Sequence, residues 1–374
     1  MRDVARLSGV SVATVSAVVN ASANVSPELK ARVADAMAAL DYHPDEVARS
    51  LKTGRTNVIG VIIPDITNAF YPEVVRGIEE AAREAGYSVV LCDSNEDSVE
   101  ESKHLSALFS RRVDGVLLAC CVNSTAYDTM LSRRYPMVFV DRVPASAGEG
   151  TVSTDNVHAG YLAARHLIEL GHQRIAMLVG NLGLSPHRDR LEGFRKAMQE
   201  SHLPILKEYL SCNGIAIENG ILAGRDLLDL AVPPTAIMVS NSKLLFGLIQ
   251  TLDERKVDIP SEVSLVSFDD YIWNRYFSPS LTTVAQMTNE MGRLSFRLLL
   301  QIINRRAGDP LAEKHVRLPA ELRVRTSTAP PGGTPSSRPA AAKGRNPQPT
   351  RAPFRRRRGS RTTPVETPTG LLGT

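Results

Sequence analysis

The chain has 374 residues and a net charge of +4, with 43% hydrophobic and 22% charged residues. This length indicates two or three domains, and the composition is that of an ordinary soluble globular protein. No apolar run reaches the roughly 18 residues that span a bilayer, and the opening "MRDVARLSGV" lacks the apolar segment of a signal peptide. We therefore expect a cytoplasmic protein.

The positive charge is concentrated at the C-terminal end. After residue 326 there are nine Lys or Arg and one Glu, a net of +8, so the rest of the chain carries −4. Residues 327–374 are rich in Pro, Gly, Ser, Thr and Arg and are expected to be disordered. Their run "FRRRRGSR" could add salt-sensitive DNA affinity or serve only as a solubilising extension. The basic balance is thus weak support for nucleic-acid binding by the folded part.

Residues 1–44 predict three short helices. The segment "RDVARLSG" ends at Gly9, and "SVATVSAVVN" after it repeats apolar residues with a helical period, as in a helix-turn-helix. The third segment, "SPELKARVADAMAAL", begins with Ser26 at the N-cap and Pro27 at the first helical position. About forty residues with so few large apolar groups predict a small helical domain.

From Asn57 onward the pattern changes to alternating strands and helices. "NVIGVIIPD" is typical of a buried parallel strand, and "FYPEVVRGIEEAAREAG" of an amphipathic helix. The alternation runs to "YPMVFVD", and a second series contains "GHQRIAMLVGN", "AIMVSN" and "SLVSFDD". We expect an α/β fold of two lobes with parallel sheets, and a ligand site where the strand ends face each other. The segment "VRLPAELRVRTST" predicts a closing strand near residue 326.

The residues offer little support for catalysis or metal binding. The four cysteines, Cys92, Cys120, Cys121 and Cys212, fit neither a CxxC pair nor a disulfide framework. Cys120 and Cys121 follow an apolar run, so burial at a strand end is expected, and a redox or metal role is unsupported. The chain has no GxGxxG after a strand, GxxxxGK[ST], HExxH or GxSxG. We expect no enzyme, cofactor or metal.

These segments, in this order, resemble the LacI/GalR family of bacterial transcription regulators. The match includes "DVARLSGVSVATVSAVVN" at 3–20, the stretch 25–65, and later blocks such as "RRVDGVLL" and "RDRLEGFRKAM". The resemblance implies a helix-turn-helix headpiece at 1–44, a hinge helix and linker at 45–56, and a periplasmic-binding-protein-like core at 57–326. It also implies a homodimer that represses transcription from near-palindromic operator DNA under the control of a small effector. The alternative is a solute-binding protein of the periplasmic type without DNA function.

The resemblance implies DNA contacts in the second helix and in the hinge. They are Ser11, Val12, Ala13, Thr14, Ser16, Ala17 and Asn20 in the headpiece, and Ala48, Arg49, Leu51 and Lys52 in the hinge. The hydroxyl side chains suit phosphates, whereas the base-facing positions, Val12, Ala13 and Ala17, can only make apolar contacts such as one with a thymine methyl. We therefore expect few direct, sequence-specific contacts between this helix and the DNA bases. Leu51 resembles the wedge that such proteins insert into the minor groove, which would supply shape-dependent specificity.

Two alternatives remain for these segments. The helix could belong to a headpiece that has lost specific binding, and the hinge could be a plain linker with one surface leucine.

Polar side chains stand at several predicted strand ends and are candidates for effector binding. They are Asp65, Asn68, Asp141, Asn241 and Asp269, joined by Arg190 at the start of a helix. Carboxylates and amides suit sugar hydroxyls, and the resemblance implies effector contacts for Arg190, Asn241 and Asp269. Asp65 and Asp141 could instead cap the helices that follow. We expect a sugar or related polyol rather than a purine.

Aromatic residues are expected to complete the effector site. Phe70 and Tyr71 would supply a stacking wall, although Phe70 could instead belong to the core. Ile215 stands where some members of the family carry a stacking aromatic, and Trp273 and Tyr276 could take over that role.

Overall fold

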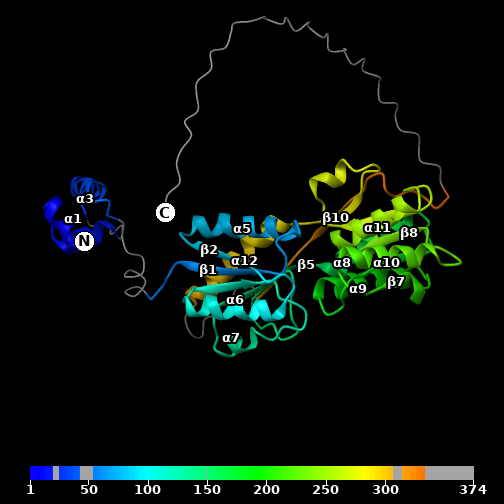
Figure 1. The fold of residues 1–374 in the computed structure, drawn as a ribbon, viewed down its shortest axis with the longest axis horizontal. Helices are drawn as coiled ribbons and strands as arrows, with labels where there is room; N and C mark the ends of the chain where they lie inside the picture. The colour runs from blue at the N-terminus through cyan, green and yellow to red at the C-terminus, as the bar shows by residue number, and fades with distance from the viewer. Residues whose placement is uncertain (20–24, 43–53, 149, 306–313, 333–374) are drawn as a thin grey trace, which may run out of the picture. The chain divides into compact units, whose positions relative to one another are not determined.

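The computed structural model describes residues 1–19, 25–42, 54–148, 150–305 and 314–332. Its N-terminal part contains three helices, α1 (Arg2–Ser8), α2 (Val12–Val19) and α3 (Pro27–Ala39), as the sequence predicts (Figure 1). Their core is small and includes the fully buried side chains of Val4, Val15 and Val33. Ser26 caps α3, because its Oγ accepts from the Leu29 N–H at 3.4 Å, and Pro27 occupies the first turn.

Gly9 lies between α1 and α2 with a φ of 63°, in the left-handed region. A Cβ there would lie 2.8 Å from Nη2 of Arg32, which donates to the Ser8 carbonyl at 2.6 Å. The positive φ therefore favours glycine, and a larger residue would also displace the end of the Arg32 side chain.

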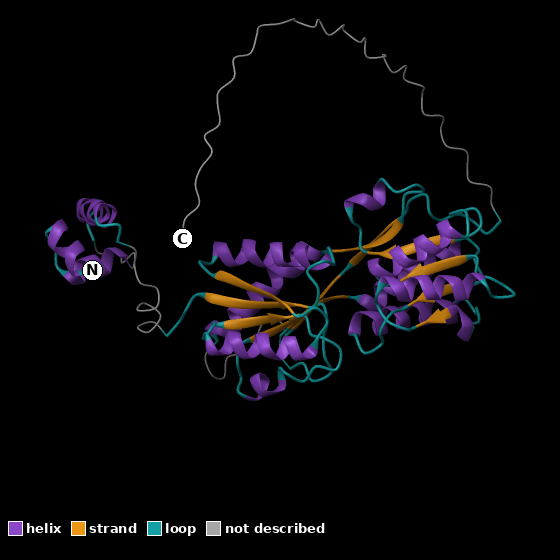
Figure 2. Ribbon diagram, viewed as in Figure 1, coloured by secondary structure: helices purple, strands orange, loops and turns teal. Residues whose placement is uncertain are grey.

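Lobe 1 is built on a six-stranded sheet in the order β11-β5-β4-β3-β1-β2, and every pair in it is parallel. Its elements are β1 (Val58–Ile63), α5 (Phe70–Glu84), β2 (Ser88–Asp93), α6 (Ser98–Ser110), β3 (Gly115–Leu118), α7 (Asp128–Ser132), β4 (Met137–Val140), β5 (Thr151–Thr154), α12 (Thr288–Asn304) and β11 (His315–Leu318). Helices cover both faces, with α5 and α12 on one and α6 and α7 on the other (Figure 2). The strands are apolar on both sides for this reason.

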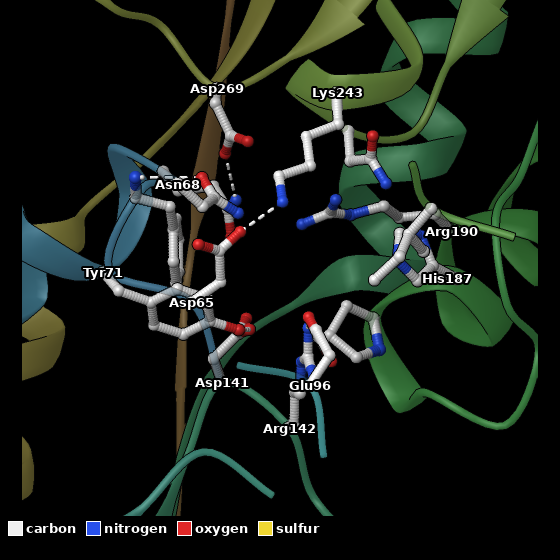
Figure 3. Close-up of a pocket in the computed structure, with 15 residues that line it drawn as sticks. Asp65, Asn68, Tyr71, Glu96, Asp141, Arg142, His187, Arg190, Lys243 and Asp269 are labelled. Atoms are coloured by element: carbon white, nitrogen blue, oxygen red, sulfur yellow. Dashed lines mark hydrogen bonds and ion pairs between the residues drawn. The ribbon is translucent and has the colours of Figure 1, made fainter. Parts of the chain in front are cut away.

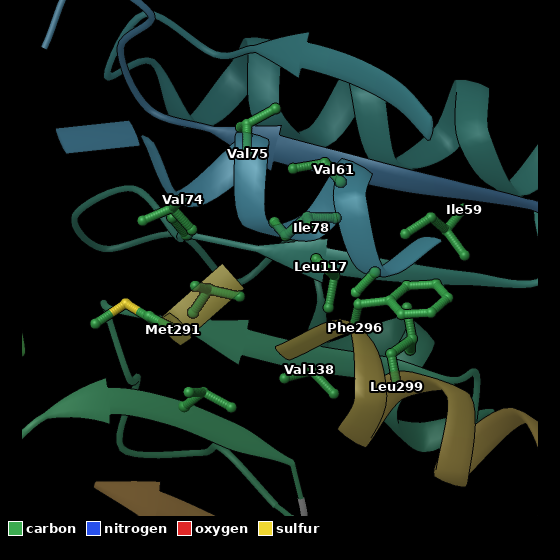
Figure 4. Close-up of a cluster of buried hydrophobic side chains, with 14 of the residues drawn as sticks. Ile59, Val61, Val74, Val75, Ile78, Leu117, Val138, Met291, Phe296 and Leu299 are labelled. Atoms are coloured by element: carbon green, nitrogen blue, oxygen red, sulfur yellow. The ribbon is translucent and has the colours of Figure 1, made fainter. Parts of the chain in front are cut away.

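The face covered by α5 and α12 holds a large part of the lobe 1 core. Figure 4 shows Ile59, Leu117 and Val138 of the sheet in one cluster with Ile78 of α5 and Phe296 of α12. Helix α12 lies about 200 residues beyond α5 in the sequence, so this core is completed by a segment that returns from lobe 2.

Lobe 2 is built on a second six-stranded sheet in the order β12-β10-β9-β8-β6-β7, in which only β12 is antiparallel to its neighbour. Its elements are α8 (Asn156–Glu169), β6 (Ile175–Leu178), α9 (Ser185–Glu200), η1 (Lys207–Tyr209), β7 (Leu210–Ser211), α10 (Ile217–Leu228), β8 (Ala236–Val239), α11 (Ser242–Glu254), β9 (Ser264–Phe268), η2 (Ile272–Arg275), β10 (Thr282–Gln286) and β12 (Ala320–Arg323). Helices α8 and α9 cover one face, and α10 and α11 the other. The two-lobed α/β fold is therefore confirmed.

The chain passes between the lobes three times, between β5 and α8, between β10 and α12, and between β11 and β12. The prediction of one closing strand is wrong in this respect, because that segment forms two strands in two different sheets. Leu318 pairs with Thr154 in lobe 1, and Ala320 pairs with Gln286 in lobe 2. Pro319 between them has no N–H and cannot continue a ladder, so the segment changes sheets there.

The predicted start of a disordered tail at residue 327 is also wrong. Ser327 is fully buried, and its Oγ donates to the Leu265 carbonyl at 2.6 Å and accepts from the Thr282 N–H at 2.8 Å. Its hydroxyl therefore links β9 to β10, a contact that composition alone does not reveal. Residues 333–374 lie outside the described part. In the described ranges, no helix combines the length and apolarity needed to cross a bilayer.

Candidate functional site

A cavity of about 50 Å³ lies between the two lobes, at the carboxyl ends of strands from both sheets (Figure 3). Its lining residues are Asp65, Asn68, Phe70, Tyr71, Glu96, Asp141, Arg142, Pro186, His187, Arg190, Ile215, Asn241, Lys243, Asp269 and Gln286. Eight of the nine predicted effector residues are thus brought together. The exception is Trp273, which packs against Phe246 and Tyr271 at ring-centroid distances of 5.0 and 5.4 Å.

Two polar contacts join the lobes across this cavity. Asp65, after β1, forms an ion pair through Oδ2 with Nζ of Lys243, in the first turn of α11. The hydroxyl of Tyr271 donates to Oδ1 of Asn68 at 3.2 Å. The cavity is much smaller than the roughly 300–1,000 Å³ of small-molecule pockets, because these side chains meet across it.

Asp65 is buried, and this favours its neutral form, but hydrogen bonds from Lys243 and Thr67 outweigh the burial and lower its pKa. Its Oδ1 accepts from the Thr67 N–H at 2.8 Å and from the Thr67 hydroxyl at 2.6 Å. Asp65 therefore closes a local turn rather than capping α5, whose N-cap is Ala69.

Arg190 extends from α9 into the cavity and is almost fully buried. Its Nε donates to Oδ1 of Asn156 at 2.8 Å, its Nη1 donates to the Ser240 carbonyl at 2.5 Å, and the guanidinium lies 4.0 Å from the centre of the Phe268 ring. Burial lowers the pKa of Arg190, although Asp269 and Asp141 oppose this shift. Its Nη2 makes no hydrogen bond with the described residues, so it remains a donor for a bound molecule.

Asp141 and Asp269 end strands in opposite lobes, with φ values of 63° and 69°. Asp141 accepts from the Tyr71 hydroxyl at 3.1 Å, and Asp269 accepts through Oδ1 from Gln286 at 2.6 Å. Burial raises the pKa of both carboxyl groups, and the charge of Arg190 opposes the shift. Both residues therefore lie in the left-handed region, which aspartate adopts more readily than most other non-glycine residues. Asp141 does not cap a helix, because β5 is the next element.

The remaining predicted residues have structural contacts as well as places in the cavity wall. Asn241 is the N-cap of α11, since its Oδ1 accepts from the Leu244 N–H at 2.8 Å. Phe70 and Tyr71 are buried and pack edge to face at 5.1 Å. Phe70 therefore belongs to both the cavity wall and the lobe 1 core.

Seven further residues line the cavity that were not predicted as wall residues from the sequence: Glu96, Arg142, Pro186, His187, Ile215, Lys243 and Gln286. Arg142 forms a bidentate ion pair with Glu96 at 2.7 and 2.8 Å. Burial disfavours the charge of Arg142, but Tyr71 and Glu96 outweigh this effect and raise its pKa. Nδ1 of His187 lies at hydrogen-bond distance, 3.0 Å, from the Ser240 hydroxyl, and burial lowers the pKa of His187 well below the ordinary value.

The cysteines near this site are buried rather than reactive. Cys120 and Cys121 follow β3, as expected, and burial raises the pKa of each thiol to about 12. Such thiols stay protonated at neutral pH and are poor nucleophiles. Among the described residues, no group of three or more His, Cys, Asp or Glu side chains could hold a metal ion.

The surface of α2 carries the small side chains that the sequence predicts. Val12 is 43% exposed and Ala13 is exposed, whereas Thr14, Ser16 and Ala17 are half-buried. Ser11 precedes α2, and its Oγ accepts from the Thr14 N–H at 3.1 Å. The predicted contacts Asn20, Ala48, Arg49, Leu51 and Lys52 lie outside the described residues.

Comparison with known proteins gives two family matches. Residues 1–45 match the model of bacterial regulatory proteins of the lacI family, and residues 164–328 match the periplasmic binding protein-like domain. The ribose operon repressor of Escherichia coli strain K12 is 36% identical over 305 residues, covering 81% of this chain and 92% of the repressor. The regulator DegA of Bacillus subtilis is 35% identical over 332 residues, covering 88% of this chain and 97% of DegA.

Solved structures show the same architecture. The lac repressor dimer bound to operator and an anti-inducer is 26% identical with a TM-score of 0.77, over 87% of this chain and 98% of that one. A LacI family transcriptional regulator from Enterococcus faecium with bound ribose is 33% identical with a TM-score of 0.64, over 73% of this chain and 99% of that one.

Proposed function

The chain belongs to the LacI family of bacterial regulatory proteins, and on that premise we propose how its two parts work together. It is a DNA-binding transcriptional regulator under allosteric control, not an enzyme. We propose that a homodimer represses from near-palindromic operator DNA in the cytoplasm, associated with the nucleoid when bound. A sugar or related polyol in the cavity between the lobes would control its affinity for the operator.

The observation that carries the effector assignment is the set of unused hydrogen-bonding groups in the cavity wall. Among the described residues, Asp141 uses one carboxylate oxygen in a side-chain hydrogen bond, which leaves the other as an acceptor, whereas Asp269 contacts both Gln286 and Tyr271. Arg190 keeps Nη2 as a donor. Vicinal hydroxyls can donate to such carboxylates and accept from a guanidinium, so the wall suits a polyol better than an apolar ligand.

The three connections between the lobes support an allosteric mechanism. The third connection pairs as β11 in one sheet and as β12 in the other, and the first two join a strand of one lobe to a helix of the other. A bound effector could therefore alter how the lobes are oriented without breaking either sheet. In the dimer, this change would alter the paired hinge segments that follow the headpieces. Coupling of this kind is typically about 1–3 kcal/mol and acts equally in both directions.

On the DNA side, specificity would be divided between α2 and the hinge. Ser11, Thr14 and Ser16 would hold phosphates, while Val12 and Ala13 would contact thymine methyl groups. Ala17 and Asn20 would extend this surface. The hinge contacts, Ala48, Arg49, Leu51 and Lys52, would bind the minor groove, with Leu51 as a wedge at a deformable step.

The proposal can be tested by selecting genomic DNA fragments with the purified full chain, with and without a panel of sugars and sugar derivatives. Enrichment of a palindrome with a deformable centre, altered by one ligand, is the expected result. Uniform affinity that depends only on salt would contradict operator recognition. The test also separates regulation from the alternative of a solute-binding protein, which would bind a ligand but select no DNA.

A further inference from the structure

Lys243 occupies the place in the cavity wall where an effector would otherwise meet Asp65. We propose that Lys243 is a specificity-determining residue, which selects a polyol carrying an anionic group, a phosphate or a carboxylate, over the neutral sugar. This inference rests on the effector-binding function proposed above and narrows its ligand class.

The Asp65–Lys243 ion pair must be broken before a ligand can enter. Asp65 is 6% exposed, and its other oxygen is already bonded to Thr67. The Lys243 side chain is 35% exposed and reaches Asp65 from the opposite lobe (Figure 3). Removing one member of a buried pair leaves the other uncompensated, which is costly. A ligand that enters here must therefore satisfy both the carboxylate and the ammonium.

The two walls of the cavity suit different chemical groups of a ligand. Lobe 1 offers the acceptors Asp65 and Asp141, which suit hydroxyl donors. Lobe 2 offers the carboxylate of Asp269 and two cationic donors that suit an anion, Arg190 and, once it is displaced, Lys243. Lys243 also lies in the first turn of the 13-residue helix α11, whose positive end adds to the attraction.

The other basic side chains in the lining are not available for this role. Arg142 is committed to Glu96 and to the Cys120 carbonyl. His187 is neutral at ordinary pH, because burial lowers its pKa well below the usual value. In the described lining, Lys243 and Arg190 are thus the cations that can receive the acidic group of a ligand.

The intrinsic tryptophan fluorescence of the chain can be used to follow ligand binding. Trp273 is its single tryptophan, and it stacks on Tyr271, whose hydroxyl bonds to Asn68 across the cavity. A ligand that separates these contacts should change the tryptophan emission. Binding can then be titrated on the full chain without DNA and checked by calorimetry.

The test compares D-ribose, D-ribose 5-phosphate and D-ribonate on the wild type and on Lys243→Met. The wild type should bind at least one of the two anionic compounds about tenfold or more tightly than D-ribose, and the better of the two identifies the anion. Lys243→Met should lose that preference while keeping or improving its affinity for D-ribose. Lys243→Arg should retain the preference, and Lys256→Met, which removes an exposed ion-paired lysine beyond the end of α11, should behave as the wild type.

Three results would overturn the inference. The first is a wild type that binds D-ribose as tightly as both anionic compounds or more tightly, which leaves the proposed function intact. The second is an equal loss of affinity for all three ligands in Lys243→Met, which would mean that Lys243 stabilises the cavity without selecting the ligand. The third is a wild type that binds none of them, which contradicts the sugar-like effector itself.

Discussion

The hydroxyl of Tyr271 donates to Oδ1 of Asn68, 3.2 Å away, and joins the loop after β9 to the loop after β1. Together with the Asp65–Lys243 ion pair, it joins the two lobes across the cavity. Neither contact belongs to the hydrophobic core of a lobe. Both can therefore break when a ligand enters, without a loss of the fold.

Tyr271→Phe removes this hydrogen bond, together with the contacts of the hydroxyl to Asp269 and Ser242, and leaves the ring stacked on Trp273. Loss of one such bond costs about 0.5–1.5 kcal/mol, and here the cost falls on the closed arrangement of the lobes. We expect altered tryptophan emission and a changed effector affinity, with little change in the melting temperature. Tyr276→Phe serves as a control, because Tyr276 is 82% exposed. An emission spectrum identical to that of the wild type would show that the contact does not hold the lobes.

Close packing between α5 and α12 leads to a stability prediction. A Cβ on Gly292 would lie 2.0 Å from the Val74 carbonyl oxygen, which is main chain and cannot rotate away. Gly292→Ala should therefore destabilise the chain by about 1–3 kcal/mol and lower the melting temperature by several degrees. Gly148→Ala is the matched control, since nothing lies within 4 Å of the added carbon. A melting temperature equal to that of the control would contradict this account.

The chain's local patterns predict much of the site but not all of it. Asp65, Asn68, Asp141, Asn241 and Asp269 could be identified because parallel strands place their carboxyl ends at one edge of a sheet. This rule depends only on recognising the strands and on the polar residue that follows each one.

Residues that act through long side chains could not be found in this way. Lys243 reaches Asp65 across the cavity, a distance in sequence of 178 residues that no local pattern encodes. Trp273 was expected in the site, but the turn that carries it directs Tyr271 toward Asn68 and stacks the indole behind it. The return of α12 and β11 to lobe 1 is likewise a long-range pairing, invisible in the periodicity of either segment.

The small side chains on α2 predict a weak but sequence-specific recognition of DNA bases. Val12→Ala removes exposed apolar surface that would contact a thymine methyl group, while the buried Val15 keeps the headpiece folded. We expect operator affinity to fall by about 1 kcal/mol, or roughly fivefold, with unchanged affinity for unrelated DNA. Titrations of both DNAs at one salt concentration provide the measurement. An equal fall on both would assign Val12 to folding or to general DNA binding.

Histidine burial predicts how stability depends on pH. The pKa of His187 is held well below 6.5 by burial and by the nearby charges of Arg190 and Arg142, while an unfolded histidine titrates near 6.5. The unfolded chain therefore binds a proton more readily than the folded chain. Stability is fully present above pH 6.5 and is lost as pH falls below it.

His166 and His172 act in the same direction, because burial also lowers the pKa of each. In His187→Gln, the fall in melting temperature between pH 7.5 and pH 5 should be smaller than in the wild type, but not abolished. Gln can still hydrogen-bond to the Ser240 hydroxyl that His187 contacts, so a lower stability at pH 7.5 is not required. The deciding quantity is the slope with pH, and a variant with the full wild-type slope would show that His187 does not titrate on unfolding.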